Sequence, residues 1–514
     1  MSEARVSAGL PPPSPLPLKT FGTVDSDQDQ QGSGKISAAR SYGAVAVLCY
    51  INLVNYMDWF TVAGVLQDIQ VYFQLGDKTA GLLHTVFILC FLLSAPVFGY
   101  IGDRYNRKII LSAGMVLWSG VTLGSSYIPK SMAWLFFISR GLVGIGTASY
   151  STVTPTIIAD LFQKDRRTWV LSVFYIFIPV GSGLGYILSA GMAEATGYWG
   201  FGFRVTPGMG LVGLVLLIFL VPISARNAAQ KHAGKTQAEE GDTSSTWIQD
   251  ISILARNRSF IWSSLGVTAM TFVTGALGFW MPLFLDRAEV ILGRVPPCQK
   301  DQCNTLNSRI FGGVTIATGI LGVILGAEAA RRYKKINARA DPLICAVGLL
   351  TSAPCMYLAV MLAQDSILAA YILIAFGEFL LSLNWAIVTD ILLHVVKPQR
   401  QSTAVSLQLF GAHLLGDAGS PFLIGIISDT IKSHKTSSHF WSFRSLQYSF
   451  VVCVVVTILG GGCFLITAFY IEEDGKEAAP PPAQGIENKS YVCDEEQRQG
   501  ELPVSPFATE AQKA

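Results

Sequence analysis

Twelve apolar stretches, each long enough to cross a membrane as a helix, constrain this chain more than any other feature of its sequence. Inside a bilayer the backbone finds no water, so a spanning segment must satisfy its own polar groups. Only 14% of the residues are charged, whereas soluble proteins have about 25%. We therefore predict an all-α membrane protein with spans near 42–66, 80–101, 109–127, 132–156, 169–193, 205–222, 260–285, 308–330, 341–363, 366–391, 401–427 and 446–471.

The distribution of basic residues predicts the side of the membrane that each loop occupies. Lys and Arg concentrate in loops that follow even-numbered spans, for example at Arg104, Arg107, Arg331 and Arg332. Because cytoplasmic loops carry this excess, and because the number of spans is even, we expect both chain ends to be cytoplasmic. The expected location is the plasma membrane or an endolysosomal membrane. The net charge of +2 gives no indication of nucleic acid binding.

The spans divide into six and six around the longest internal loop, the polar segment 223–258. We predict an N-terminal half at 42–222 and a C-terminal half at 259–471. The end segments 1–41 and 472–514 are polar and contain runs of Pro. Such a composition cannot bury enough apolar surface to fold, so we expect two disordered cytoplasmic tails.

The loop after the second span carries a motif that begins at Gly99 and reads Gly-Tyr-Ile-Gly-Asp-Arg-Tyr-Asn-Arg-Lys. A degraded copy follows the eighth span. Together with the twelve spans, this motif resembles the signature of the major facilitator superfamily, whose fold has two six-helix halves. In this loop the carboxylate of Asp103 can interact with the N-terminus of a neighbouring helix. Arg104 and Arg107 can form ion pairs with carboxylates such as Asp160.

Polar and ionisable side chains recur inside several predicted spans. A charge at membrane depth is costly and by default faces a protein interior or a watery cavity. Helical spacing places the polar residues of each of four spans on one face of that span. We therefore expect Asp58, Arg140, Glu378 and His413 to face a common interior. The four faces are Asn52, Asn55 and Asp58; Arg140, Gly144, Thr147, Ser151 and Thr154; Glu378, Ser382 and Trp385; and His413, Asp417 and Ser420.

Each of these groups has a structural alternative. Asp58 and Glu378 are also consistent with buried hydrogen-bond acceptors. Arg140 is also consistent with a side chain that binds the acid of the signature loop or backbone carbonyls. His413 is also consistent with a packing histidine, and its alignment with Asp417 supports the cavity interpretation. Aromatic residues such as Tyr150 are mostly expected to pack, with a minority lining a cavity.

Two further segments lead to predictions about structure. The glycine-rich stretch from Pro179 to Gly185 has no strand before it, so it is not a nucleotide loop. We expect a close helix contact or a hinge there. Cys298 and Cys303 lie in a polar, non-cytoplasmic loop where oxidation is permitted, and we predict a disulfide between them. The sequence indicates no metal site and no cofactor.

Longer motifs narrow the resemblance to one family. They are Asn55-Tyr-Met-Asp58, Ala148-Ser-Tyr-Ser-Thr, Ile178-Pro-Val-Gly-Ser-Gly-Leu-Gly-Tyr186, Asn384-Trp-Ala-Ile and the segment from His413 to Pro421. From about 42 to 471 the chain closely resembles the spinster family of lysolipid and sphingolipid transporters. The resemblance implies a monomer in the bilayer that moves single-chain lipids by alternating access, with protons as a candidate coupling ion. It also implies cavity roles for Asp58, Arg140, Glu378, Trp385 and His413, to which we add Thr147, Tyr150 and Asp417.

Two positions depart from the family pattern. Trp59 follows Asp58 where the family has an arginine, and Thr147 stands where it has a glutamate. The internal repeat agrees, because Thr147 corresponds to Glu378 in the other half. At both positions the chain resembles one vertebrate subtype of the family.

These departures bear on mechanism. They leave Asp58 without its usual neighbouring cation, and we expect weakened or absent proton drive. The alternative is a non-transporting scaffold or regulator that keeps the carrier fold. An enzyme is not expected, since neither His-Glu-x-x-His nor Gly-x-Ser-x-Gly occurs.

Overall fold

The structure is a computed structural model that describes residues 38–162, 164–221, 247–298, 303, 305–397 and 400–478. Within these residues, twelve helices are long and apolar enough to cross a membrane. Each overlaps one of the twelve predicted spans. The prediction of an all-α membrane fold is therefore confirmed.

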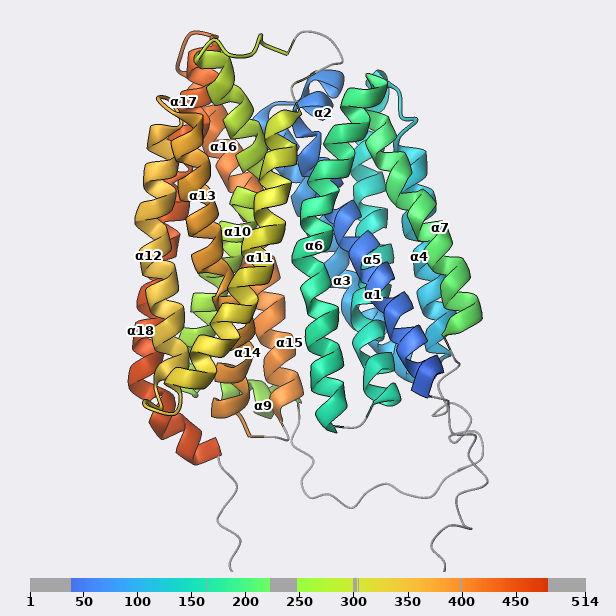
Figure 1. Cartoon of the computed structure of the whole chain (residues 1–514), viewed down its shortest axis with the longest axis vertical. Helices are drawn as coiled ribbons and strands as arrows, with labels where there is room; N and C mark the ends of the chain where they lie inside the picture. Colours follow the sequence, from blue (N-terminus) through green and yellow to red (C-terminus); the bar gives the residue numbers. More distant parts are fainter. Residues whose placement is uncertain are drawn as a thin grey trace, which may run out of the picture.

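The N-terminal half, drawn in blue and green in Figure 1, contains seven α-helices and two short 3₁₀ turns. Its tight turns have recognisable causes, such as the Asn106 side chain that accepts from Lys108 N and starts α4. The elements are α1 (Ala38–Gly64), α2 (Leu66–Phe73), α3 (Asp77–Arg104), α4 (Arg107–Ser125), η1 (Lys130–Met132), α5 (Ala133–Leu161), α6 (Lys164–Thr196), η2 (Trp199–Phe201) and α7 (Gly202–Leu220).

The C-terminal half, yellow-green to red in Figure 1, has two interrupted spans. The tenth span divides into α13 and α14 at Leu383, and the eleventh contains a π-helical turn, η4. The elements are α9 (Trp247–Leu254), α10 (Arg258–Ile291), α11 (Leu306–Tyr333), α12 (Ala340–Leu362), α13 (Ile367–Ser382), α14 (Asn384–Val395), α15 (Gln401–Gly411), η4 (Ala412–Asp417), α16 (Ser420–Ser433), α17 (His439–Ser449) and α18 (Val451–Ala478).

Helical structure extends into segments predicted as loop or tail. Helix α9 lies within the predicted central loop, where Asp250 accepts a 2.7 Å hydrogen bond from Arg400 Nε. Helix α18 continues past 471 because its acidic residues find partners: Arg339 Nε donates to Glu472 at 2.7 Å, and Ser259 N donates to Asp474 at 2.7 Å. Helix α1 begins at Ala38. The remaining tail predictions lie outside the described residues.

The two halves stand side by side and meet mainly where α3 packs on α16 and α6 packs on α11 (Figure 1). Glycine permits the second crossing: a Cβ on Gly183 would lie 2.3 Å from the carbonyl oxygen of Gly312. One on Gly319 would lie 2.4 Å from Pro179 Cβ. The glycine-rich stretch is thus a close helix contact, which is one of the two roles predicted for it.

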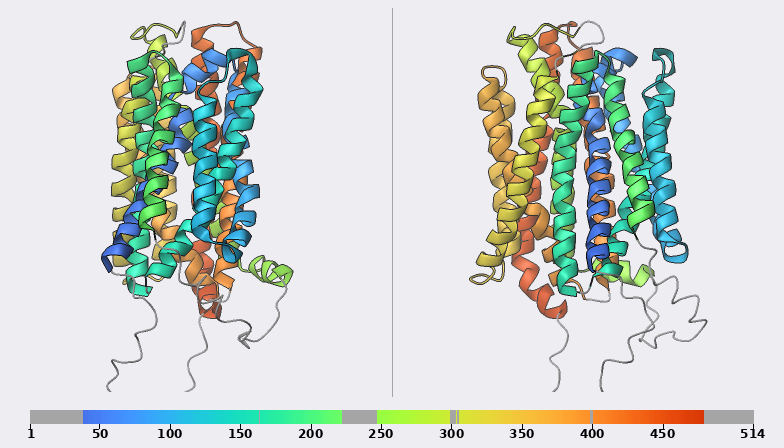
Figure 2. Two further views of the ribbon diagram at one scale, coloured as in Figure 1. Left: turned by 90° about the vertical axis from the view of Figure 1, so that its right-hand side faces the viewer. Right: turned by 45° about the vertical axis from the view of Figure 1, so that its right-hand side comes forward.

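The bundle has two distinct ends. We call them the α2 end, at the top of Figure 1, and the α9 end, at the bottom. Helix α1 begins and α18 ends at the α9 end, and both views of Figure 2 show α9 there as well. The start of the first described helix and the end of the last therefore lie on the same side of the bundle.

The signature loop joins α3 to α4 at the α9 end. Arg107 Nε donates to the carbonyl oxygen of Gly102 at 3.2 Å, and Arg104 lies 4.2 Å from the ring centroid of Tyr100. A Cβ on Gly99 would meet nothing within 4 Å, so no close approach explains this glycine. The predicted carboxylates, Asp103 and Asp160, have side chains outside the described residues.

Candidate functional site

A buried ion pair lies at the centre of the N-terminal half. Arg140 of α5 and Asp58 of α1 are 2% and 1% exposed, and Arg140 Nη2 is 3.6 Å from Asp58 Oδ2. Thr206 donates to Asp58 Oδ1 at 2.8 Å and Thr122 to Oδ2 at 3.4 Å. Because α1, α4, α5 and α7 each supply one of these groups, we call them the N-half cluster.

The expectation that Asp58 lacks a neighbouring cation is wrong. Arg140 lies beside Asp58 although it belongs to another helix, α5. The spacing of residues along one helix cannot predict such a contact between two helices. Trp59, in the position of the missing arginine, packs instead among aromatic rings. Its centroid lies 4.6 Å from that of Phe87 and 5.7 Å from those of Phe91 and Tyr56.

The C-terminal half holds its carboxylate differently. Glu378 of α13 is half-buried and accepts from Thr318 Oγ1 at 3.2 Å and Thr315 Oγ1 at 3.4 Å, both on α11. We call these three residues the C-half cluster. Two of the residues predicted to share its helix face differ in placement. Ser382 packs against Gly322 of α11, and Trp385, beyond the break at Leu383, is 43% exposed.

His413 and Asp417 form a third polar set on η4. His413 Nδ1 lies 3.0 Å from Asp417 Oδ2, so the predicted alignment of this pair corresponds to a contact. The extra residue of a π-helical turn displaces side chains from the regular helical face, and such turns are frequent at functional sites. Asp417 packs against Gly275 of α10, where an added Cβ would lie 2.6 Å from Asp417 Cβ.

The remaining predicted cavity residues pack within the N-terminal half. Tyr150 is buried, and its hydroxyl donates to the Leu48 carbonyl oxygen at 2.6 Å, which fastens α5 to α1. Thr147 is buried on the same helix. The four ionisable groups expected in one interior are thus held in three separate sets.

One residue of the seam between the halves was missed from the sequence. His84 of α3 is 9% exposed, and its ring centroid lies 5.4 Å from that of Phe279 in the other half. Further along α3, Phe91 lies 5.9 Å from His413, and Thr85 Oγ1 donates to the Ala418 carbonyl oxygen at 2.5 Å. The sequence signal for this residue was a single histidine within an apolar span. A polar side chain at membrane depth is costly, so it is a candidate functional residue.

A charged network closes the seam at the α2 end. Asp77, at the start of α3, is 1% exposed and accepts from Arg287 Nη2 and Lys432 Nζ, each at 2.6 Å. Ser428 Oγ donates to it at 2.7 Å. Asp429 in turn accepts from the backbone N–H groups of Asp77 and Lys78 at 3.2 and 2.7 Å. We call this network, which joins α3 to α10 and α16, the outer latch.

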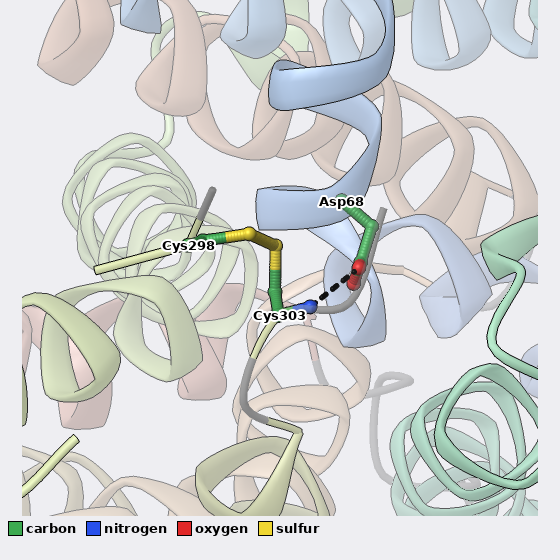
Figure 3. The surroundings of a disulfide bond; sticks show 3 residues. All are labelled: Asp68, Cys298 and Cys303. Atoms are coloured by element: carbon green, nitrogen blue, oxygen red, sulfur yellow. Dashed lines mark hydrogen bonds between the residues drawn. A yellow bond between two sulfur atoms is a disulfide. The ribbon is translucent and has the colours of Figure 1, made fainter. Parts of the chain in front are cut away.

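The predicted cysteine pair also lies at the α2 end. Cys298 and Cys303 form a disulfide, and Cys303 N donates to Asp68 of α2 at 3.2 Å (Figure 3). Glu194 of α6 accepts from Thr305 Oγ1 at 2.9 Å and pairs with Arg309 at 2.5 Å. The loop between α10 and α11 therefore bonds two helices of the N-terminal half.

Comparison with known proteins identifies the family. The Major Facilitator Superfamily model matches residues 48–421. Protein spinster homolog 3 of Homo sapiens is 54% identical over 473 residues, which cover 92% of this chain and 91% of that protein. The chain belongs to the spinster family of the major facilitator superfamily. This confirms the predicted family and the subtype that Trp59 and Thr147 indicated.

Other spinster proteins are nearly as similar. Protein spinster homolog 1 of Bos taurus is 51% identical over 486 residues, covering 93% of this chain and 91% of that protein. Among solved structures, a bacterial homolog to human lysosomal transporter, Spinster, in an inward-facing and unoccupied conformation has a TM-score of 0.71 and 19% identity. It covers 87% of this chain and is itself covered completely. The D-xylose-proton symporter, with a TM-score of 0.60 and 17% identity, shares the fold.

Proposed function

We propose that this spinster protein carries single-chain lipids across a membrane by alternating access. The substrate class is sphingolipids that resemble sphingosine 1-phosphate, or lysophospholipids. The observation that supports this most is the placement of a buried cation, Arg140, in one half and of His413 in the other, with α3 between them. A guanidinium suits a phosphate because it offers a planar fork of donors.

The second headgroup charge of such a lipid is an amine, and Glu378 is the better partner for it. Asp58 is already paired with Arg140, whereas the partners of Glu378 among the described residues are the hydroxyls of Thr315 and Thr318. A carboxylate with neutral partners gains more from an added cation than one that already has a cation beside it. Apolar faces of the spans around the seam would hold the tail.

Alternating access requires that the two halves rock about the site. The outer latch is the contact that must break when the α2 end opens. One of its two carboxylates, Asp77, holds cations from both α10 and α16. In this proposal the chain ends are cytoplasmic, so the α2 end of the bundle faces away from the cytoplasm. The host membrane is the plasma membrane or an endolysosomal membrane. The carrier works as a monomer and catalyses no reaction.

Proton drive is weak or absent in this proposal. The acid that the family has in the fourth span is Thr147 here, and Asp58 is occupied by Arg140. The lipid would then move down its own gradient. A strong acceleration of lipid uptake by an imposed pH gradient would contradict this part of the proposal.

The test is lipid flux in vesicles that contain the purified protein. Fluorescent sphingosine 1-phosphate and lysophosphatidylcholine should cross faster than in protein-free vesicles. Asp77→Asn removes the charge that holds the outer latch, so it should change the rate of flux without abolishing insertion. A scaffold or regulator would move neither lipid, with or without the substitution, and that result would overturn the proposal.

A further inference from the structure

Two hydrogen-bond donors of the N-terminal half have no hydrogen-bond partner among the described residues, and one of the two is a fully buried atom. One is Nη1 of Arg140. The other is the imidazole of His84, whose side chain is 9% exposed and makes no hydrogen bond to another described residue. A buried polar group left without a partner costs about 1–3 kcal/mol. Such groups therefore deserve a functional or structural explanation.

The two donors lie beside one aromatic ring. Both border the ring of Phe87, with Arg140 Cζ 5.6 Å and the His84 centroid 6.3 Å from its centre. An aromatic ring cannot satisfy the two donors in the way that an anion's oxygens would, because charge-assisted bonds from N–H groups to an anion are among the strongest in proteins.

The charges around His84 permit an anion there. The titratable groups that act on it are Arg140, Asp417 and His413. Asp417 is engaged by His413 Nδ1 at 3.0 Å, and Asp58 by Arg140 Nη2 at 3.6 Å. Both nearby carboxylates thus already face a positive or proton-donating partner, which reduces their repulsion of a third negative group.

His84 also reaches the other half of the molecule. Its ring lies against Phe279 of α10, and Phe91, on the same face of α3, lies against His413. An anion held by His84 and Arg140 would therefore sit at the seam, within range of groups from both halves. A ligand in that position is sensed by both halves at once, as alternating access requires.

We propose that His84 and Nη1 of Arg140 form an anion subsite that takes a phosphate group, with His84 as the residue that distinguishes phosphorylated from unphosphorylated ligands. The identification of that phosphate as a lipid headgroup rests on the proposed function. The competing explanation is that His84 is a neutral ring that fills space among Trp59, Phe87 and Phe279.

Two substitutions separate these explanations. His84→Phe keeps an aromatic ring and removes both nitrogens, while His84→Gln keeps a hydrogen-bond donor of similar reach. Binding is measured by thermal shift of the purified full-length protein, titrated with sphingosine 1-phosphate and with sphingosine, which lacks the phosphate. For the phosphorylated lipid, His84→Phe should raise the half-saturating concentration about tenfold or more, the loss expected for a bond to a charged group. His84→Gln should retain most of the affinity, and sphingosine should bind all three proteins alike.

A different pattern would overturn the subsite. His84→Phe that binds both lipids like the wild type, or that weakens both equally, would assign His84 to packing. Inorganic phosphate provides an arm that does not depend on lipid. If the wild type binds neither lipid but is stabilised by inorganic phosphate while His84→Phe is not, the subsite stands and the lipid proposal fails. If phosphate stabilises both proteins equally or neither, the subsite fails.

Discussion

The two halves hold their central carboxylates in opposite ways. In the N-half cluster Asp58 is buried with a cation, Arg140, 3.6 Å away and two hydroxyl donors. In the C-half cluster Glu378 is half-buried and accepts from the hydroxyls of Thr315 and Thr318. Asp58 is paired within its own half and belongs to the scaffold, while Nη1 of its partner Arg140 has no hydrogen-bond partner among the described residues. A charge that meets only neutral groups within its own half is available to a ligand or a proton.

The internal repeat sharpens this contrast. Thr147 and Glu378 are corresponding residues, and Arg140 and Tyr371 each lie seven positions before them. The cation of one half therefore corresponds to a phenol in the other, and Tyr371 donates to Asn307 Oδ1 at 2.5 Å. The carboxylate of one half corresponds to a threonine in the other. Each half keeps one of the two charges at these positions. Among the described residues, the charge of the N-terminal half pairs with an opposite charge, Asp58 of α1, while Glu378 meets neutral hydroxyls.

The largest effect is expected when the N-half pair is broken. Arg140→Met leaves Asp58 buried with hydroxyl donors alone, and an uncompensated buried charge costs about 3–5 kcal/mol of stability. The measurement is the free energy of unfolding of the purified protein in detergent. Asp58→Asn combined with Arg140→Met removes both charges and should recover most of the loss. Equal stability of the wild type and Arg140→Met would show that the pair is not part of the scaffold.

An intermediate effect is expected when the C-half arrangement is copied into the N-terminal half. Thr147→Glu places a second acid in a half that has one central cation, so stability should fall by about 1–3 kcal/mol. Adding Trp59→Arg supplies a cation and should recover part of that loss. The double variant should also gain lipid uptake driven by a pH gradient in vesicles. If uptake by the double variant stays independent of the gradient, the proposed site of proton coupling is wrong.

The fold could be predicted because each span is defined by its own residues. The twelve apolar runs and the glycine-rich stretch can be recognised in the sequence without knowing which helices are neighbours. The break at Leu383 was missed, because the run 366–391 has no proline or glycine beside Leu383. The π-helical turn η4 was missed as well.

The candidate site was harder to predict, because it depends on which helices meet. Helical spacing placed Asp58 and Arg140 on polar faces, yet it could not show that those faces meet each other. Asp77 stood at a span boundary and was read as loop. His84 was a single polar residue without a helical pattern. The pairing of Asp58 with Arg140 depends on contacts between helices that are far apart in the sequence, and the sequence alone did not show those contacts.

The smallest effect on stability is expected at Glu378. This substitution tests whether the carboxylate of the C-half cluster serves a ligand and not the scaffold. Glu378→Gln keeps an acceptor for Thr315 and Thr318 while it removes the charge, so the free energy of unfolding should change by less than about 1 kcal/mol. Transport of an amine-bearing lipid such as lysophosphatidylethanolamine should nevertheless fall about tenfold or more, because the cation loses its partner. Lysophosphatidic acid, which has the phosphate without the amine, is the matched substrate and should be transported as before. Equal loss for both lipids, or a loss of stability as large as that of Arg140→Met, would place Glu378 in the scaffold alongside Asp58 and remove the distinction between the two halves.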